Sequence, residues 1–106
     1  MKNLCKAMLG VMIFALAVSM FSVAQSGADT FKAKCAMCHG ADGKGDTAMG
    51  KTLKLKDLGS ADVQGKSDAD LTGIITNGKD KMPKYDGKLT KDQISDVVKF
   101  IRTLKH

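Results

Sequence analysis

Apolar residues are unevenly distributed along the chain. An apolar run covers residues 7–21, interrupted only by Gly10 and Ser19. From residue 29 onward, apolar positions recur at helical spacing between glycine-rich loops. The chain shows no strand pattern bounded by turn residues on both sides, so the sequence predicts an all-α fold without a β-sheet.

The clearest helix is predicted near the end of the chain, over residues 91–105. Thr90 and Gln93 stand at the spacing of a capping box, in which each side chain binds the other residue's backbone N–H. Behind this signal, apolar residues follow at helical spacing, at positions 94, 97, 98, 101 and 104.

Two further helices are predicted upstream. One covers about residues 67–77, starts with a Ser–Asp capping pair and ends at Gly78. The other covers about residues 30–38, with Asp29 as its N-cap and Gly40 at its end.

The intervening segments are predicted to be loops. Residues 40–50 contain four glycines without an apolar period, and residues 78–89 surround the dipeptide Met82–Pro83. Between these loops, three leucines could belong to a short helix or to an irregular stretch with inward-facing side chains: Leu53, Leu55 and Leu58.

Residues 1–24 show the three-part pattern of a cleaved signal peptide. A short basic start precedes the apolar run, and small residues follow it. The run is shorter than the roughly 20 residues of a membrane-spanning helix. We expect cleavage after Ala24, with a cut after Ala28 as the alternative, and a mature domain over residues 25–106 exported to the periplasm.

Composition limits the chain to one small domain that needs support beyond ordinary packing. It has 106 residues, 5% aromatics and no Trp, so its own core should be marginal. These values exclude a multidomain enzyme. Loss of Lys2 and Lys6 with the signal peptide would lower the formal net charge from +6 to +4.

The sequence CAMCH at residues 35–39 carries the main chemical signal. Two thiols three residues apart on a helix project to one side, where they can add to the two vinyl groups of haem, and His39 can bind the iron. A thioredoxin-like dithiol would need a βαβ context, and zinc would need four ligands. A plain disulfide would leave His39 unexplained. We therefore expect one covalently bound haem c, attached at Cys35 and Cys38.

A second axial ligand is expected on the opposite face of the iron. Met37 lies inside the attachment motif and cannot reach that face, and Met49 suits a role as core filler. Met82 stands next to Pro83 in a stiff loop and belongs to no apolar face, so we predict His39/Met82 ligation.

These motifs together resemble class I cytochrome c of the small single-haem bacterial and photosynthetic types. The resemblance rests on CAMCHGADGKG, NGKDKMPKY and GKLTKDQISDVVKFIRTL, in this order, and covers nearly all of residues 29–105. It implies an all-α fold wrapped around one haem. The first and last helices would cross where Phe31 meets Phe100. The implied site is Cys35 and Cys38 as thioether positions, His39 as the proximal ligand and Met82 as the distal ligand.

One departure from the family concerns the loop after the attachment motif. Ala48 lies where many relatives have a proline, whose neighbourhood supplies a carbonyl to the proximal histidine. We expect a backbone carbonyl near Thr47 or Ala48 to accept the ring N–H of His39 instead. Tyr85 or a lysine is a candidate partner for a haem propionate.

The predicted function is a monomeric electron carrier, not an enzyme, with redox proteins as partners. We expect the haem to be buried by Leu53, Leu55, Leu58, Leu71, Ile74, Ile75, Val97, Val98 and Ile101. Five lysines could steer an acidic partner: Lys32, Lys34, Lys79, Lys81 and Lys84. Export and mixed charges argue against nucleic acid. The alternative is a haem-based ligand sensor or weak peroxidase in which Met82 is displaceable.

Overall fold

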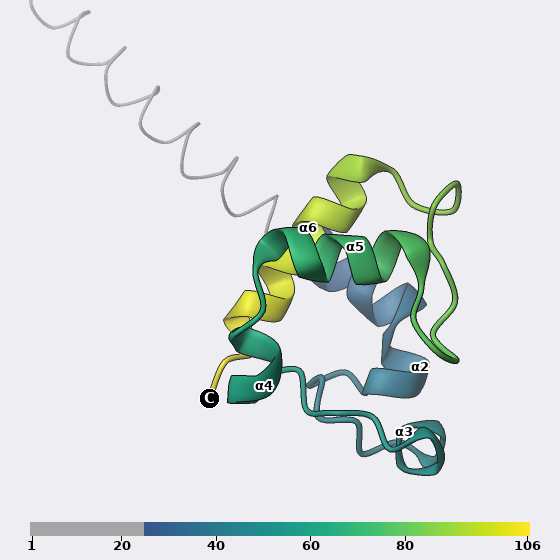
Figure 1. Ribbon diagram of the computed structural model, residues 1–106, viewed down its shortest axis with the longest axis vertical. Coiled ribbons are helices and arrows are strands. Elements are labelled where there is room, and N and C mark those ends of the chain that lie inside the picture. The colour runs from purple at the N-terminus through teal and green to yellow at the C-terminus, as the bar shows by residue number, and fades with distance from the viewer. Residues whose placement is uncertain (1–24) are drawn as a thin grey trace, which may run out of the picture.

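The computed structural model describes residues 25–106, which form a set of helices joined by irregular loops (Figure 1). Within these residues the extended pairing is limited to two isolated bridges, so the predicted all-α class is confirmed. A helical segment covers residues 25–34. It is followed by α2 (Ala36–His39), α3 (Ala48–Leu53), α4 (Ala61–Gln64), α5 (Asp68–Asn77) and α6 (Lys91–Thr103).

The first helix differs from its prediction at both ends. It is already helical at residue 25 rather than at 30, so Asp29 lies inside it and is not its N-cap. The helix is interrupted at Cys35, where the Cys38 and His39 amides both donate to the Cys35 carbonyl, at 3.3 and 3.0 Å. The attachment motif therefore occupies its own short turn, α2, which ends at Gly40 as predicted.

The helices α5 and α6 follow their predictions closely. The Ser67 side chain accepts the amide of Asp70 at 3.0 Å, and both halves of the Thr90–Gln93 capping box are present. Helix α6 ends at Thr103, two residues earlier than predicted. The Leu104 amide donates to the Ile101 carbonyl at 3.0 Å, and the His106 amide donates to the Gly59 carbonyl at 3.2 Å rather than within the helix.

Two short helices flank the leucine stretch whose structure the sequence left open, and Leu55 and Leu58 lie in irregular backbone between them. Thr47 caps α3 by accepting the amide of Gly50 at 2.9 Å. Residues 48–50, which were predicted to belong to the loop over 40–50, are therefore helical. Helix α4 is a single turn that is stabilised by hydrogen bonds to residues outside the helix. The Gln64 side chain donates to the carbonyl of Leu58 at 2.8 Å and to that of Ile101 in α6 at 3.0 Å.

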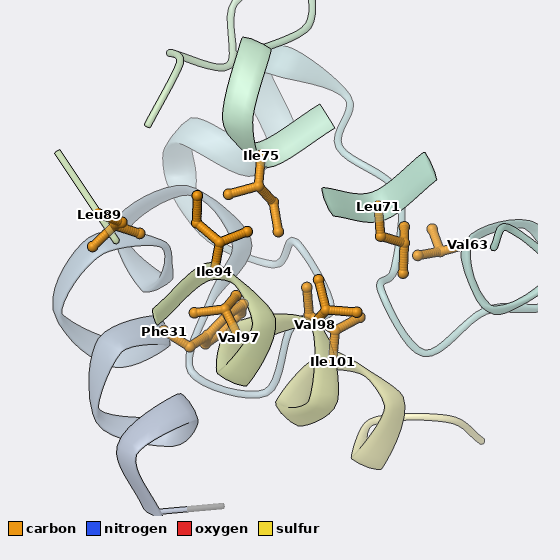
Figure 2. Packing of buried hydrophobic residues seen from close by; sticks show 9 residues of the cluster. All are labelled: Phe31, Val63, Leu71, Ile75, Leu89, Ile94, Val97, Val98 and Ile101. Carbon is orange, nitrogen blue, oxygen red and sulfur yellow. The ribbon is translucent and has the colours of Figure 1, made fainter. Parts of the chain in front are cut away.

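The core lies where the first helical segment crosses α6. Phe31 is 1% exposed, and its ring centroid is 5.0 Å from that of Phe100, as the family resemblance implied. Figure 2 shows Val63 of α4 and Leu71 of α5 pointing toward one another beside this crossing. The buried cluster consists of Phe31, Val63, Leu71, Ile75, Leu89, Ile94, Val97, Val98 and Ile101.

Arg102 ties the segment between α4 and α5 to the end of α6. Its guanidinium donates to the carbonyls of Gln64 at 3.0 Å and Lys66 at 2.6 Å, and to the carboxylate of Asp68 at 2.9 Å. These bonds fix the end of α4 and the start of α5 against α6. No helix within residues 25–106 is long and apolar enough to cross a membrane.

Candidate functional site

A cavity of about 580 Å³ opens between the attachment motif, α5, α6 and the loop that contains Met82. Its volume lies within the range of about 300–1,000 Å³ that is usual for small-molecule and cofactor sites. Several helices and two loops contribute to its wall, so it exists only in the folded chain. The functional candidates that line it are Cys35, Cys38, His39, Met82, Pro83 and Tyr85.

Both cysteines of the attachment motif are half-buried free thiols on this wall. Burial, and next the neighbouring Cys38, raises the pKa of the Cys35 thiol to about 11. At neutral pH this sulfur is therefore uncharged and lies in apolar surroundings. Such a pair suits attachment of a large apolar group better than a redox dithiol, which needs a lowered thiol pKa.

His39 lies beside the two thiols at the end of α2, with its ring centroid 6.5 Å from that of Phe31. Burial lowers the pKa of the His39 imidazole, which favours the neutral form that binds a metal. Its Nδ1 atom is buried without a hydrogen-bond partner among the described residues.

The expected carbonyl partner for His39 near Thr47 or Ala48 is therefore wrong for this structure. The Thr47 hydroxyl instead donates to the carbonyl of Cys38 at 2.6 Å and accepts the amide of Gly50. This loop thus holds the backbone of the attachment motif rather than the histidine ring.

Met82 reaches the cavity from a tight turn. The amide of Met82 donates to the Lys79 carbonyl at 2.9 Å, and the Lys79 amide donates back at 3.2 Å. Asp80 takes a positive φ of 54° to close the turn. The Met82 side chain is half-buried and packs against the core.

The other two methionines of the described chain lie outside this cavity. Met37 is 82% exposed, which agrees with the prediction that it cannot serve as a ligand. Met49 is 46% exposed on α3, so its predicted role as core filler is wrong. It lies two residues after the N-cap of α3 and on the outside of that short helix.

The apolar part of the wall matches the predicted set with one exception. Leucines 53, 55 and 58 turn inward as expected, and α5 and α6 supply the rest. Val98 was predicted to line the cavity but is buried in the core cluster instead, beside the cavity-lining Val97 and Ile101. The confirmed apolar residues are Leu53, Leu55, Leu58, Leu71, Ile74, Ile75, Val97 and Ile101.

Lysines surround the cavity more completely than the sequence analysis predicted. Of the five predicted lysines, Lys34, Lys79 and Lys81 line it, whereas Lys32 and Lys84 are exposed elsewhere. Three lysines were missed, namely Lys54, Lys56 and Lys66. The alternation of leucine and lysine over residues 53–56 was the available signal, because inward leucines leave the lysines at the rim.

The donor set fits a covalently bound haem better than a zinc ion. Two thiols, a neutral imidazole and a thioether face one large apolar cavity. Zinc would require four close nitrogen, sulfur or oxygen ligands. Within residues 25–106, no three histidine, cysteine or acidic side chains gather at a distance suited to a metal ion.

Comparison with known proteins agrees with this chemistry. Residues 22–101 match the sequence family described as cytochrome c oxidase, cbb3-type, subunit III. The chain is similar to cytochrome c6 of Nostoc sp., with 38% identity over 89% of this chain and 85% of that protein. It is also similar to cytochrome c6 of Leptolyngbya boryana, with 38% identity over 74% of this chain and 88% of that protein.

A solved structure shows the same fold. The KustC0563 c-type cytochrome superposes with a TM-score of 0.70 at 28% identity, covering 76% of this chain and 98% of that one. A helical fold, an attachment motif on the wall of a large apolar cavity and relatives of this kind lead to one conclusion. The chain belongs to the c-type cytochromes, as a small class I member that binds haem c covalently.

Proposed function

We propose that the chain carries single electrons between redox proteins through one haem c bound in the cavity. The observation that supports this most directly is the convergence of Cys35, Cys38, His39 and Met82 on one apolar space. When bound, haem supplies an iron that gains one electron as it passes from ferric to ferrous.

In this proposal the attachment motif holds the cofactor at two edges. Cys35 and Cys38 would hold the haem through thioether bonds to its two vinyl groups, each formed by addition of the S–H across the double bond. His39 and Met82 would ligate the iron. The apolar lining favours the less charged ferrous state and so raises the reduction potential.

The alternative of a ligand sensor or weak peroxidase has less support. Peroxide cleavage needs a polar group beside the open iron position. His39 is the single histidine among the described residues that line the cavity, and no arginine lies there. The proposal therefore includes no enzyme activity.

A matched pair of methionine variants tests the axial ligand. We expect a pyridine haemochrome spectrum with two thioethers, and a ferric protein with a methionine–iron charge-transfer band. Met82→Ala should abolish this band, whereas Met49→Ala, which changes an exposed methionine, should keep it. A band that survives in Met82→Ala would overturn the ligand assignment, and material without a haem spectrum would overturn the function.

We further propose that the partner docks at the lysine-rich rim of the cavity. Six lysines line the cavity, at positions 34, 54, 56, 66, 79 and 81, against one acidic residue, Asp80. Lys56 is paired with Asp62 at 3.4 Å, and the pair is exposed. This charge suits an acidic partner surface, and the carrier would act as a monomer.

Salt dependence tests the docking proposal. Electron transfer to an acidic redox protein should slow steeply as ionic strength rises, because salt screens exposed charges. The double variant Lys79→Gln/Lys81→Gln should reduce both the rate and its salt dependence. The matched variant Lys91→Gln, at the start of α6 and outside the cavity wall, should leave both unchanged. A rate that is indifferent to salt would contradict the proposal.

Export and processing after Ala24 complete the proposal. Gly27 is buried where the first helical segment meets α6, and a Cβ there would overlap the Asp96 carbonyl and lie 3.3 Å from the Phe100 Cβ. A cut after Ala28 would remove this contact, whereas a cut after Ala24 preserves it. The intact mass of periplasmic protein should correspond to a chain that starts at Gln25. A start at Asp29 would contradict this.

A further inference from the structure

One hydrogen bond joins the segment that precedes the attachment motif to the loop that carries Met82. The hydroxyl of Tyr85 donates to the backbone carbonyl of Lys34 at 2.9 Å, across 51 residues of sequence. Lys34 directly precedes the first attachment cysteine, and Tyr85 lies three residues after Met82. All four residues line the cavity.

The Lys34 carbonyl is available because the helix is interrupted at Cys35. In a continuous helix, the amide of Cys38 would donate to the carbonyl of Lys34 four residues earlier. Here the Cys38 amide donates to Cys35 instead, at 3.3 Å. The break that separates the attachment motif from the first helical segment thus creates the acceptor that Tyr85 uses.

Hydrogen bonds hold the backbone of Tyr85 in place, and this restricts where its hydroxyl can lie. Its amide donates to the Ile75 carbonyl in α5 at 3.0 Å, and its carbonyl accepts the amides of Lys88 and Leu89, both at 2.9 Å. The side chain is half-buried and packs against the core. Burial raises the pKa of Tyr85, which keeps the hydroxyl protonated as a donor.

The start of the Met82 turn, residues 78–85, packs closely against the turn itself. A Cβ on Gly78 would lie 2.8 Å from the Met82 carbonyl oxygen and 3.0 Å from the Lys84 nitrogen. Between Gly78 and Tyr85, the residues that flank Met82 on both sides are exposed. Among the described residues, the side-chain hydrogen bond that joins residues 78–85 to the attachment segment therefore comes from Tyr85.

We propose that Tyr85 is a positioning residue whose hydroxyl latches the Met82 turn to the attachment segment and so keeps the thioether on the iron. The proposal deepens the proposed function and rests on it. Because a small ligand can bind the iron only when Met82 has left, its apparent affinity reports the fraction of open molecules.

The test uses the haem-loaded ferric protein and imidazole as the probe. The variant Tyr85→Phe removes one hydrogen bond with little change in side-chain volume. We expect this variant to raise the apparent imidazole affinity about fivefold. The methionine–iron band should be lost at a correspondingly lower imidazole concentration. Tyr85→Leu, which also removes the ring packing, should show an increase at least as large.

A control variant separates the latch from a general loss of stability. His106→Ala removes the 2.7 Å hydrogen bond to Asp57, away from the Met82 turn. It should lower resistance to denaturant but leave imidazole affinity unchanged. An equal affinity rise in His106→Ala and Tyr85→Phe would overturn the proposal. Wild-type affinity in Tyr85→Phe, whether or not Tyr85→Leu differs, would overturn it as well.

The same experiment distinguishes this proposal from the function on which it rests. A wild-type protein that shows the methionine–iron band, together with an unaffected Tyr85→Phe variant, would refute the latch alone. A wild-type protein without that band would refute the ligand assignment, and with it the latch.

Discussion

The loop after the attachment motif and the loop that carries Met82 are built on different principles. Residues 40–50 are packed backbone against backbone, and all four of their glycines are buried, namely Gly40, Gly43, Gly45 and Gly50. The loop that carries Met82 is largely exposed and is held at its ends by hydrogen bonds to α5 and to Lys34.

This difference separates a rigid side of the site from an adjustable one. Close packing admits almost no displacement, because even one added methylene is felt in a dense interior. Hydrogen bonds at two ends allow a turn to open when one of them breaks. We infer that the attachment side fixes where the haem lies, whereas the Met82 side controls how often the sixth iron position is closed.

The largest expected effect is that of haem removal, which takes away the apolar group that the cavity wall would pack against. The chain has few large side chains that could replace those contacts. We expect the chain without haem to lose most of its helix by circular dichroism. A helical apoprotein that unfolds cooperatively would contradict this expectation.

The next effect compares Gly50 of α3, which packs against the loop after the attachment motif, with Gly87 of the loop that carries Met82. A Cβ on Gly50 would overlap the Gly45 carbonyl and lie 2.7 Å from the Cys38 carbonyl oxygen, so Gly50→Ala should cost about 2–3 kcal/mol through overpacking. Gly87 has open space around it but a φ of +80°, so Gly87→Ala should cost about 1 kcal/mol. Denaturant midpoints of the two haem-loaded variants would measure both costs. Equal losses would contradict the proposed difference between the loops.

A smaller effect concerns backbone strain in the Met82 turn. Asp80 has a positive φ of 54°, which glycine adopts freely, so Asp80→Gly should stabilise the protein by about 0.5 kcal/mol. Asp86, in the same loop, is not among the positive-φ residues and provides the matched control. Asp86→Gly should destabilise by a similar amount. Thermal unfolding that ranks the two variants in the opposite order would refute the strain argument.

The smallest effect is a pH dependence of the free energy of unfolding at Asp57, whose carboxylate accepts the Gly59 amide and contacts the His106 ring. The backbone amide of Gly59, and after it His106, holds the pKa of Asp57 below its ordinary value of 3.8. A lowered carboxyl pKa adds stability above the ordinary value and loses it as pH falls through the native value. Asp57→Asn should therefore be less stable than wild type at pH 7, and the difference should shrink below pH 3.8. A difference that is constant with pH would show that the carboxylate charge is not involved.

The parts of the fold that were predicted correctly depend on interactions between near neighbours in sequence. Thr90 and Gln93 cap α6 across three residues, and Ser67 does the same for α5. The positions of Cys35, Cys38, His39 and Met82 on one cavity wall were likewise anticipated from motif spacing and loop chemistry.

The parts that were missed depend on contacts between distant segments. Helix α4 is one turn long and is held by Gln64 bonds to α6, which no local pattern reveals. Met49 lies on the outside of α3, and Val98 faces the core rather than the cavity. Each of these outcomes depends on which neighbour a side chain meets after folding.

The amino-acid sequence by itself determined the helical class, the attachment motif, the candidate ligand set and the need for a large apolar cofactor. These features follow from the spacing of a few residues and from a composition too poor in large side chains to form a core alone. Only the tertiary structure decided the break at Cys35, the Tyr85 bond to Lys34, the unpartnered Nδ1 of His39 and the full ring of lysines. The physical reason is that a hydrogen bond or a packing contact across 51 residues depends on where whole segments come to rest.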